Sequence, residues 1–451
     1  MNEKLAVWKA GLQGKSVCVV GIGISHLPLI EYLASCGAKV IACDRKTEEA
    51  LGETATMLKA KGVTLHLGDT YLDNLDGDVI FKTPGMRPDV PQLLAARERG
   101  IEITTEMEVF MELCPAPIAA VTGSDGKTTT TTLIHRLFSM SGKKTHVGGN
   151  IGTPLLPVID TISADDQVVL ELSSFQLQTM RQSPQKAVIT NITPNHLDYH
   201  KDYQEYIDAK KNLLLYQQKE NIAILNLDNE VTASLVKECP GRVMTFSRKG
   251  TADVCLQGDY ITVQGEPVLN IHDIKIPGMH NVENYMAAIA AVYPAVSKEI
   301  IVQCAKEFGG VPHRIELVRE KDGVRYYNSS IDSSPNRTIN TLRVFSEPVV
   351  LIAGGKDKGI PYDALGPAIR EHVKAMVLIG ATAPVIGEVA AKYAPDVPAF
   401  YEDSYEAGVK RAAELAEAGD VVLMSNASTS FDLFPNFEVR GNLFKELVNR
   451  L

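Results

Sequence analysis

The chain has 451 residues, which is enough for about three domains of ordinary size. Hydrophobic residues make up 45% and charged residues 22% of it, the composition of a globular protein with several packed cores. Its net charge of -10 argues against a protein that coats nucleic acid or an acidic membrane surface.

The cysteines and the N-terminal segment bear on where the protein works. Seven cysteines are scattered without a C-x-x-C pair, which favours reduced thiols over a disulfide framework or a zinc site. The first residues lack the apolar stretch of a signal peptide, and no apolar run approaches the roughly 20 residues of a membrane span. We therefore expect a cytoplasmic protein that binds neither nucleic acid nor a membrane. We also expect it to be a monomer.

The first predicted domain, residues 1–106, begins with a strand, a glycine turn, a helix and a second strand. The strands are "SVCVV" and "KVIACD", and the helix between them ends near Cys36, with Gly37 as its cap. Short apolar strands that alternate with helices indicate a parallel, doubly wound, Rossmann-like sheet.

The glycine turn of this domain, "GIGIS", partly matches the dinucleotide-binding fingerprint. Gly21, Gly23 and Asp44 have suitable spacing, but His26 stands where the third glycine belongs. Three interpretations stay open: binding of NAD, binding of another nucleotide, and a purely structural turn.

The second predicted domain, residues 107–311, contains the stretch "VTGSDGKTTTTTL". Only two residues separate Gly123 from Gly126, whereas the common phosphate loop has four between its glycines. The stretch lies between an apolar strand and a helical segment, where backbone N–H groups can face phosphates. Lys127 would offset the phosphate charge and a threonine hydroxyl could reach Mg²⁺. The alternative is a glycine turn that starts a threonine-rich helix.

Further strands of the second domain, "QVVLELS", "KAVITNI" and "IAILNL", place polar groups at one sheet edge. Glu171 ends the first of them and could hold Mg²⁺ or simply cap the next segment. His196 and Asp198 follow the second strand, although an isolated histidine is more often structural. Lys210, taken by itself, is expected to be a surface lysine. Residues 241–276 alternate like antiparallel strands and predict a small side sheet.

Polar residues also mark the end of the second domain. Asn281 and Asn284 are three apart on one helical face and could contact an adenine, or could cap and pack the helix. His313 and Arg314 stand at the predicted domain junction. Arginine suits phosphate recognition because its planar fork donates in pairs, and an ion pair between domains is the alternative.

The third predicted domain, residues 312–451, has the buried strands "PVVLIAGG", "AMVLIG" and "DVVLMS", each followed by a helical stretch. Candidate binding residues follow the first and last of these strands; they are Lys356, Lys358, Ser430, Phe437 and Arg440. Because the carboxyl ends of parallel strands share one edge, we expect these residues to lie near one another.

Taken in order, these motifs resemble the Mur ligases, ATP-dependent amide-forming enzymes of peptidoglycan precursor synthesis. The short loop has their T-G-x-x-G-K-[ST] form. The match continues along the chain through "GNIGTP", "ELSSFQ", "NHLDYH", "YIDAK", "HNVEN" and "PHR". "KTPG" and the closing "SFDLFPNFEVRGNLF" are similar to the branch that adds D-glutamate to UDP-N-acetylmuramoyl-L-alanine.

The resemblance implies three α/β domains, a central ATPase-type domain, and a role for each matching residue. ATP would contact Gly123, Ser124, Asp125, Gly126, Lys127, Thr128, Thr129, Asn281, Asn284, Arg314 and Asp332. Two Mg²⁺ ions would be held by Thr128, Glu171, His196 and Lys210, with Lys210 carbamylated because a bare ammonium repels Mg²⁺. UDP-N-acetylmuramoyl-L-alanine would contact Ile24, Ser25, Asp44, Arg45, Thr83, Asn150 and His196, and D-glutamate would contact Lys358, Ser430 and Phe437. The catalytic residues implied are Lys127, His196 and Lys210, with His196 as the general base.

One stretch, residues 332–337, departs from the family. It has Ser334 and Asn336 where the family often has lysine and threonine. Asn336 or Arg337 would then replace the expected contact with D-glutamate. Other functions remain: a Mur ligase for another amino acid, a ligase like folylpolyglutamate synthase, an NAD-dependent oxidoreductase, and an ATP-dependent switch without catalysis.

Overall fold

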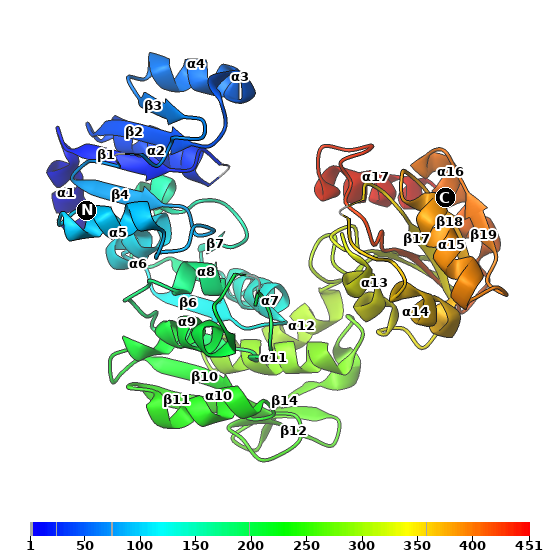
Figure 1. Cartoon of the computed structure of the whole chain (residues 1–451). Helices are drawn as coiled ribbons and strands as arrows, with labels where there is room; N and C mark the ends of the chain where they lie inside the picture. The colour runs from blue at the N-terminus through cyan, green and yellow to red at the C-terminus, as the bar shows by residue number, and fades with distance from the viewer. Residues whose placement is uncertain (1–2, 24, 74, 198, 358) are drawn as a thin grey trace. The chain divides into compact units, whose positions relative to one another are not determined.

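The computed structural model describes residues 3–451 except 24, 74, 198 and 358, and the described residues form three α/β sheets (Figure 1). Contacts divide the chain into two compact units. The first unit, Met1–Ile271 with Val282–Cys304, contains two of the sheets, and the second, His272–Asn281 with Ala305–Leu451, contains the third. The predicted domain boundaries near 106 and 311 lie between the sheets and stay predictions.

The first sheet has five parallel strands in the order β3-β2-β1-β4-β5. The strands are β1 (Ser16–Val20), β2 (Lys39–Asp44), β3 (Thr64–Leu67), β4 (Val79–Lys82) and β5 (Glu102–Thr104). The helices are α1 (Glu3–Leu12), α2 (His26–Ser35), α3 (Glu48–Leu51), α4 (Glu53–Ala60), α5 (Pro91–Glu98) and α6 (Glu106–Leu113). Val17 and Val19 pack with α2, whereas Cys18 and Val20 pack with α5, so helices cover both faces.

The central sheet has the order β14-β13-β12-β11-β10-β9-β6-β8-β7. Its strands are β6 (Ile118–Thr122), β7 (Thr145–Gly149), β8 (Gln167–Glu171), β9 (Lys186–Ile189), β10 (Ile222–Asn226), β11 (Arg242–Ser247), β12 (Val254–Gln257), β13 (Tyr260–Val263) and β14 (Glu266–Asn270). Its helices are α7 (Lys127–Met140), α8 (Ser174–Leu177), α9 (Tyr203–Leu215), α10 (Glu230–Ser234), α11 (Met279–Val292) and α12 (Lys298–Glu307). Short 3₁₀ turns are η1 (Leu156–Thr161), η2 (Leu235–Glu238) and η3 (Ile271–Asp273).

The prediction of a separate side sheet over residues 241–276 is wrong. Strand β11 pairs in parallel with β10, and β12 pairs in parallel with β11. Only β12, β13 and β14 form an antiparallel meander, and it continues the central sheet at its edge. Alternation in the sequence shows that a strand has one exposed face, but it does not show which neighbour the strand pairs with.

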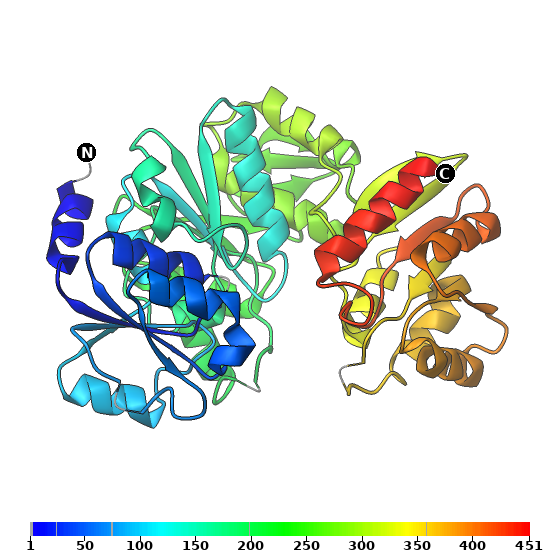
Figure 2. The same cartoon turned by 90° about the horizontal axis from the view of Figure 1, so that it is seen from above.

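The third sheet has the order β15-β16-β20-β17-β18-β19, parallel except for the β15–β16 hairpin. Its strands are β15 (Glu316–Lys321), β16 (Val324–Asn328), β17 (Val349–Ala353), β18 (Val373–Leu378), β19 (Ala399–Tyr401) and β20 (Val421–Met424). Its helices are α13 (Pro335–Leu342), α14 (Leu365–His372), α15 (Ala383–Tyr393), α16 (Tyr405–Leu415) and α17 (Phe437–Arg450). Helices α13, α14 and α15 pack on one face and α16 and α17 on the other. In Figure 2 the red helix α17 lies alongside the β15–β16 hairpin that it contacts.

The predicted fold class, three mainly parallel and doubly wound sheets, is therefore confirmed. Fully buried strands such as Val349–Ala353 consist of consecutive apolar residues in the sequence because helices cover both faces of the sheet. Among the described residues, no helix combines the length and the apolar character needed to cross a membrane.

Candidate active site

The phosphate loop follows strand β6 at the end of the central sheet where the parallel strands finish. Strand β6 has β8 on one side and β9 on the other, and all three are parallel. The loop therefore lies between Glu171, at the end of β8, and residues 190–193, which follow β9. Open α/β sheets bind ligands at the carboxyl ends of two neighbouring strands whose following connections run to opposite sides of the sheet.

The loop requires glycine at both of its glycine positions. Gly126 has φ 77° as the left-handed N-cap of α7, and a Cβ there would overlap Oδ1 of Asn284. Gly123 has φ 154°, and a Cβ there would overlap Oγ1 of Thr190. The Ser124 amide donates to the Asn191 carbonyl at 2.9 Å, which fixes the loop to the segment after β9. The short spacing thus builds a compact loop whose backbone approaches its neighbours closely.

We expect the change Gly126→Ala to abolish ATP binding and to lower the free energy of unfolding by about 1–3 kcal/mol, because the left-handed backbone and the overlap with Asn284 both penalise a Cβ. Calorimetric titration with ATP and denaturant unfolding measure the two effects. The matched control is Gly142→Ala, since Gly142 has φ 85° and no atom within 4 Å of its Cβ position. The control isolates the backbone cost, about 1 kcal/mol, and should leave ATP binding intact; ATP binding by Gly126→Ala would contradict the assignment of the loop.

Lys127 is the first residue of α7 and folds back over the loop. Its Nζ donates to the carbonyls of Gly123 and Ser124, each at 2.9 Å. Of the threonines that follow, Thr130 and Thr131 are fully buried, and the Thr132 hydroxyl donates to the Thr128 carbonyl at 2.7 Å. The helix thus starts here although threonine is a poor helix former, because the first turn is packed and hydrogen-bonded.

Glu171 has the environment of a cation ligand. Its side chain is 1% exposed, and Oε1 accepts a hydrogen bond from Nδ2 of Asn150 at 2.7 Å. Oε2 is buried and has no hydrogen-bond partner among the described residues. A buried carboxylate oxygen without a partner is costly, so a cation at this position would stabilise it. Asn150, expected near the sugar substrate, thus also orients Glu171.

The expectation that Lys210 by itself is a surface lysine is wrong. Its side chain is 1% exposed because it lies on the face of α9 that packs against the sheet. Nζ donates to the Gly123 carbonyl at 2.8 Å and to Thr122 Oγ1 at 3.3 Å. Burial, with a contribution from the charge of Lys127, holds the pKa of Lys210 well below its usual range. A lysine with a lowered pKa is more readily the free amine that reacts with CO₂.

Tyr206 lies beside Lys210, and the centre of the His196 ring is 6.3 Å from that of the Tyr206 ring. His196 has a left-handed backbone (φ 55°), and its exposed ring meets the edge of the Phe175 ring at 5.0 Å. The Tyr206 ring lies 4.7 Å from Lys210 Nζ, and its hydroxyl is 2.9 Å from Ser124 Oγ. Sequence reasoning missed Tyr206, although its place four residues before Lys210 puts both on one helical face. Asp198 lies outside the described residues.

In the first sheet, the structure brings Gly21, Asp44 and Thr83 together at the carboxyl ends of β1, β2 and β4. The Asp44 carboxylate accepts hydrogen bonds from the amides of Ile22 (2.6 Å) and Lys46 (2.8 Å), so it organises the glycine turn. His26, at the position of the third glycine, is buried, and its Nδ1 lies 3.1 Å from the Val20 carbonyl oxygen. Two further candidates, Ser25 and Arg45, are exposed, and Ile24 lies outside the described residues.

In the third sheet, candidate residues gather at the ends of β16 and β20. Asp332 is buried and accepts hydrogen bonds from Thr341 Oγ1 (2.7 Å) and Ser425 Oγ (2.8 Å). Arg440 is 1% exposed and donates to the Ser330 carbonyl at 2.7 Å. The remaining candidates are Ser430, which is buried, Phe437, which begins α17, Lys356, Asn336 and Arg337, which are exposed, and Lys358, which lies outside the described residues.

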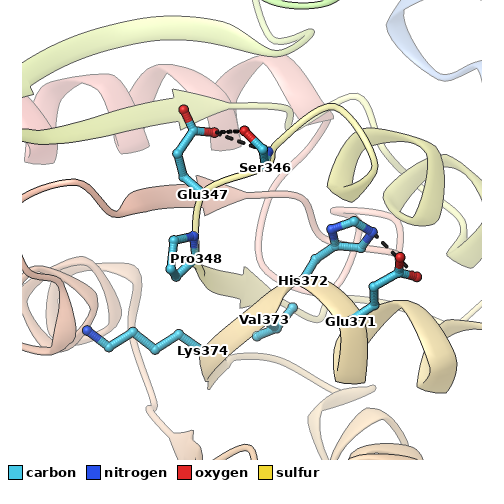
Figure 3. A pocket seen from close by; sticks show the side chains of 7 residues that line it. All are labelled: Ser346, Glu347, Pro348, Glu371, His372, Val373 and Lys374. Carbon is cyan, nitrogen blue, oxygen red and sulfur yellow. Dashed lines mark hydrogen bonds and ion pairs between the residues drawn. The ribbon is translucent and has the colours of Figure 1, made fainter.

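Two further candidates, Asn281 and His313, belong to the unit that contains the third sheet. Asn281 lies on α11 and donates from Nδ2 to the Pro277 carbonyl at 2.6 Å. His313 is buried, with Nδ1 3.0 Å from Nδ2 of Asn328, and precedes Arg314. Figure 3 shows a hollow in the same unit, next to His372 and Lys374. It lies where β17 and β18 begin, at the edge opposite to the candidate residues, so none of them lines it.

The described residues contain no group of three or more His, Cys, Asp and Glu side chains arranged to hold a metal ion. Mg²⁺ is usually held by one or two protein oxygens together with water and substrate phosphates. The buried Oε2 of Glu171, which has no hydrogen-bond partner among the described residues, fits such a site. A strand, a short glycine loop and a helix start in this arrangement are typical of proteins that bind the phosphates of a nucleotide.

Comparison with known proteins makes the assignment more specific. The family models match the Mur ligase MurD-like N-terminal domain at residues 15–105, the Mur ligase middle domain at 121–292 and the Mur ligase glutamate ligase domain at 313–427. The chain belongs to the Mur ligase family.

Relatives and solved structures agree with this assignment. UDP-N-acetylmuramoylalanine–D-glutamate ligases of Ruminiclostridium cellulolyticum, Acetivibrio thermocellus and Clostridium novyi are 53%, 52% and 51% identical, each over 100% of both chains. The structure of UDP-N-acetylmuramate-alanine ligase MurC from Thermotoga maritima covers 97% of this chain and 99% of its own. It has a TM-score of 0.59 at 19% identity, a likeness of fold.

Proposed function

We propose that this protein is an ATP-dependent ligase that joins D-glutamate to UDP-N-acetylmuramoyl-L-alanine in peptidoglycan precursor synthesis, with release of ADP and phosphate. The observation that carries the proposal is the sheet edge where the phosphate loop lies between Glu171 and Lys210. Relatives that share about half of all residues over their full length bear the name of this ligase.

The chemistry requires that a carboxylate be activated. The L-alanyl carboxylate of the sugar substrate attacks the γ-phosphorus of ATP, so that an acyl phosphate forms and ADP leaves. The amine of D-glutamate then adds to the acyl carbon, and the resulting intermediate expels phosphate as the amide forms. Such phosphoryl transfer depends on positioning and on neutralising charge, which the loop amides, the start of α7 and Lys127 would provide.

Bound Mg²⁺ would neutralise phosphate charge at this edge. Thr128 and Glu171 would hold one ion, and His196 and carbamylated Lys210 would hold a second. The carbamate forms when the neutral Nζ of Lys210 bonds to the carbon of CO₂ and loses a proton. The product is an anion, whereas a protonated lysine would be a cation. The buried Nζ, within 3.3 Å of two oxygen atoms, is held where such an anion would face the phosphate loop.

The remaining candidates would bind the two substrates. Asp44, Arg45, Ser25 and Thr83, with Ile24, would contact the uridine diphosphate end of the sugar substrate. Asn281, Asn284, Arg314 and Asp332 would contact ATP. Ser430, Phe437 and Lys358 would locate D-glutamate, with Asn336 or Arg337 in place of the family's usual threonine. His196 would accept the proton from the incoming ammonium group in a state in which its basic nitrogen does not hold Mg²⁺. We also expect a cytoplasmic monomer.

A phosphate-release assay with a panel of amino acids tests the function. We expect release only when ATP, UDP-N-acetylmuramoyl-L-alanine and D-glutamate are all present. Equal activity with L-glutamate, L-alanine, lysine or a folate would contradict the D-glutamate assignment. Hydride transfer with NAD would favour the oxidoreductase, and ATP binding without turnover under any acceptor would favour a switch.

A further inference from the structure

Arg87 lies in the loop between β4 and α5, four residues after Thr83, and contacts the segment that carries His196. The loop and that segment belong to the same compact unit. The partners of Arg87 are Asp89 in its own loop, Tyr199, and Glu205 in the first turn of α9. We call these four residues the Arg87 clamp.

Every N–H donor of the Arg87 guanidinium is used. Nε and Nη2 donate to the two carboxylate oxygens of Asp89, each at 2.9 Å. Nη1 and Nη2 donate to the two carboxylate oxygens of Glu205 at 3.1 and 3.0 Å. Nη1 also donates to the Tyr199 carbonyl at 2.5 Å, and the guanidinium lies 5.5 Å from the centre of the Tyr199 ring. Two bidentate pairs of this kind fix the orientation of the planar guanidinium relative to both carboxylates, which an ammonium group cannot do.

The clamp is connected to the candidate catalytic residues through short chains of contacts. Tyr199 packs on Phe175 at 4.3 Å, and Phe175 meets the His196 ring at 5.0 Å. The amides of Tyr199 and His200 donate back to the His196 carbonyl. Glu205 also accepts the Lys201 amide at 2.8 Å and precedes Lys210 by five residues on α9. The clamp thus contacts this part of the chain at two points, Tyr199 and Glu205.

The two carboxylates of the clamp share Arg87 as a cation. Asp89 and Glu205 both face Arg87, and without the guanidinium these two carboxylates would lose their shared partner. Their side chains are 37% and 23% exposed, so the pairs are only partly screened by solvent. Hydrogen bonds from Arg87 lower the pKa of Glu205 to about 2 and also lower the pKa of Asp89, so both carboxylates are ionised at neutral pH. Lys201 lies 3.1 Å from Asp89, but its ammonium group cannot form the two planar forks that the guanidinium forms.

We propose that Arg87 is a positioning residue of the ligase: it holds the His196 loop and the start of α9 in one arrangement relative to the loop that carries Thr83. This role rests on the proposed function, in which His196 and Lys210 hold a metal ion. Arg87 itself contacts neither of them. It acts on the loop through Tyr199 and on the helix through Glu205.

The first test measures the clamp directly, without catalysis. Hydrogen–deuterium exchange of the full chain, with no ligand added, compares the wild type with Arg87→Lys. We expect the amides of Tyr199, His200 and Lys201 to exchange at least about tenfold faster in the variant, while amides in α7 exchange at the wild-type rate. Equal exchange at these three amides would overturn the proposal.

The second test measures catalysis. Because a displacement of about 1 Å can cost 10²-fold in rate, we expect Arg87→Lys to lower kcat by roughly 10–100-fold, with the KM for ATP changed less than about threefold. Arg87→Ala and Glu205→Ala should lower kcat by similar factors, and the double variant should be no slower than either single one. Multiplicative losses, or a wild-type kcat in Arg87→Lys, would overturn the proposal.

The matched control is Arg411→Lys, because Arg411 on α16 also pairs with two carboxylates, Glu402 and Glu414, at 3.2 and 3.0 Å. It should match the wild type in exchange and in kcat. The proposed function and the positioning role of Arg87 can be refuted independently. An inactive wild type would refute the proposed function but leave the exchange result to decide on the clamp, whereas an active wild type with a fully active Arg87→Lys would refute the clamp alone.

Discussion

Replacing Lys127 with methionine is expected to lower ATP-dependent phosphate release by on the order of 10³-fold, because the cation aimed at the developing phosphate charge is lost. Methionine keeps most of the apolar stem. The two hydrogen bonds from Nζ to the carbonyls of Gly123 and Ser124 are lost as well, which lowers the free energy of unfolding by about 1–2 kcal/mol. A phosphate-release assay and thermal unfolding measure the two effects separately.

The control for this change is Lys143→Met, since Lys143 is exposed beyond the C-terminal end of α7. It should leave both the rate and the unfolding temperature unchanged. A Lys127→Met enzyme that keeps more than about a tenth of the wild-type rate would be incompatible with a phosphate-binding role for this ammonium group.

Replacing Lys210 with alanine is expected to abolish ligation, with a loss of at least about 10³-fold, and added acetate should restore part of the rate. The substitution removes the nitrogen that carries the carbamate, and a small carboxylate can occupy the space that the side chain leaves. Lys210→Met fills most of that space, so it should be equally inactive but should not respond to acetate.

Lys211→Ala is the matched control, because Lys211 is the neighbouring lysine on α9 and its Nζ pairs with Glu238 at 2.6 Å. It should retain the wild-type rate. The carbamate itself can be observed by ¹³C NMR after equilibration with labelled bicarbonate, as a carbonyl signal that Lys210→Met lacks. Wild-type activity of Lys210→Ala would refute the carbamate.

The sequence predicts the strands well because each is a short apolar run with both faces buried, as in Val349–Ala353. It also predicts the phosphate loop, since Gly123 and Gly126 are required by local backbone geometry. The burial of Lys210 had no such local signal. A lysine in a helical segment is predicted to be exposed to solvent unless the strand against which that helix packs is known.

The missed features share a cause. Arg87 and Glu205 are 118 residues apart, and neither stands in a recognisable motif. The pairing of β11 with β10 likewise depends on which edge of the sheet is open when the strand docks, and alternation does not encode this. Periodicity and short motifs report local geometry, whereas these contacts arise only from tertiary packing.

The Arg87 clamp has a consequence for recombining this chain with its relatives. A chimaera could take its first hundred or so residues from another ligase. Its first sheet would then be joined to the central sheet of this chain near residue 105, where the N-terminal family model ends. Such a graft would discard Arg87 and keep Glu205, and it would also split the apolar cluster in which Leu29 and Val19 share a core with Leu170 and Ile189. The segments that form the first two sheets should therefore be taken from the same parent protein.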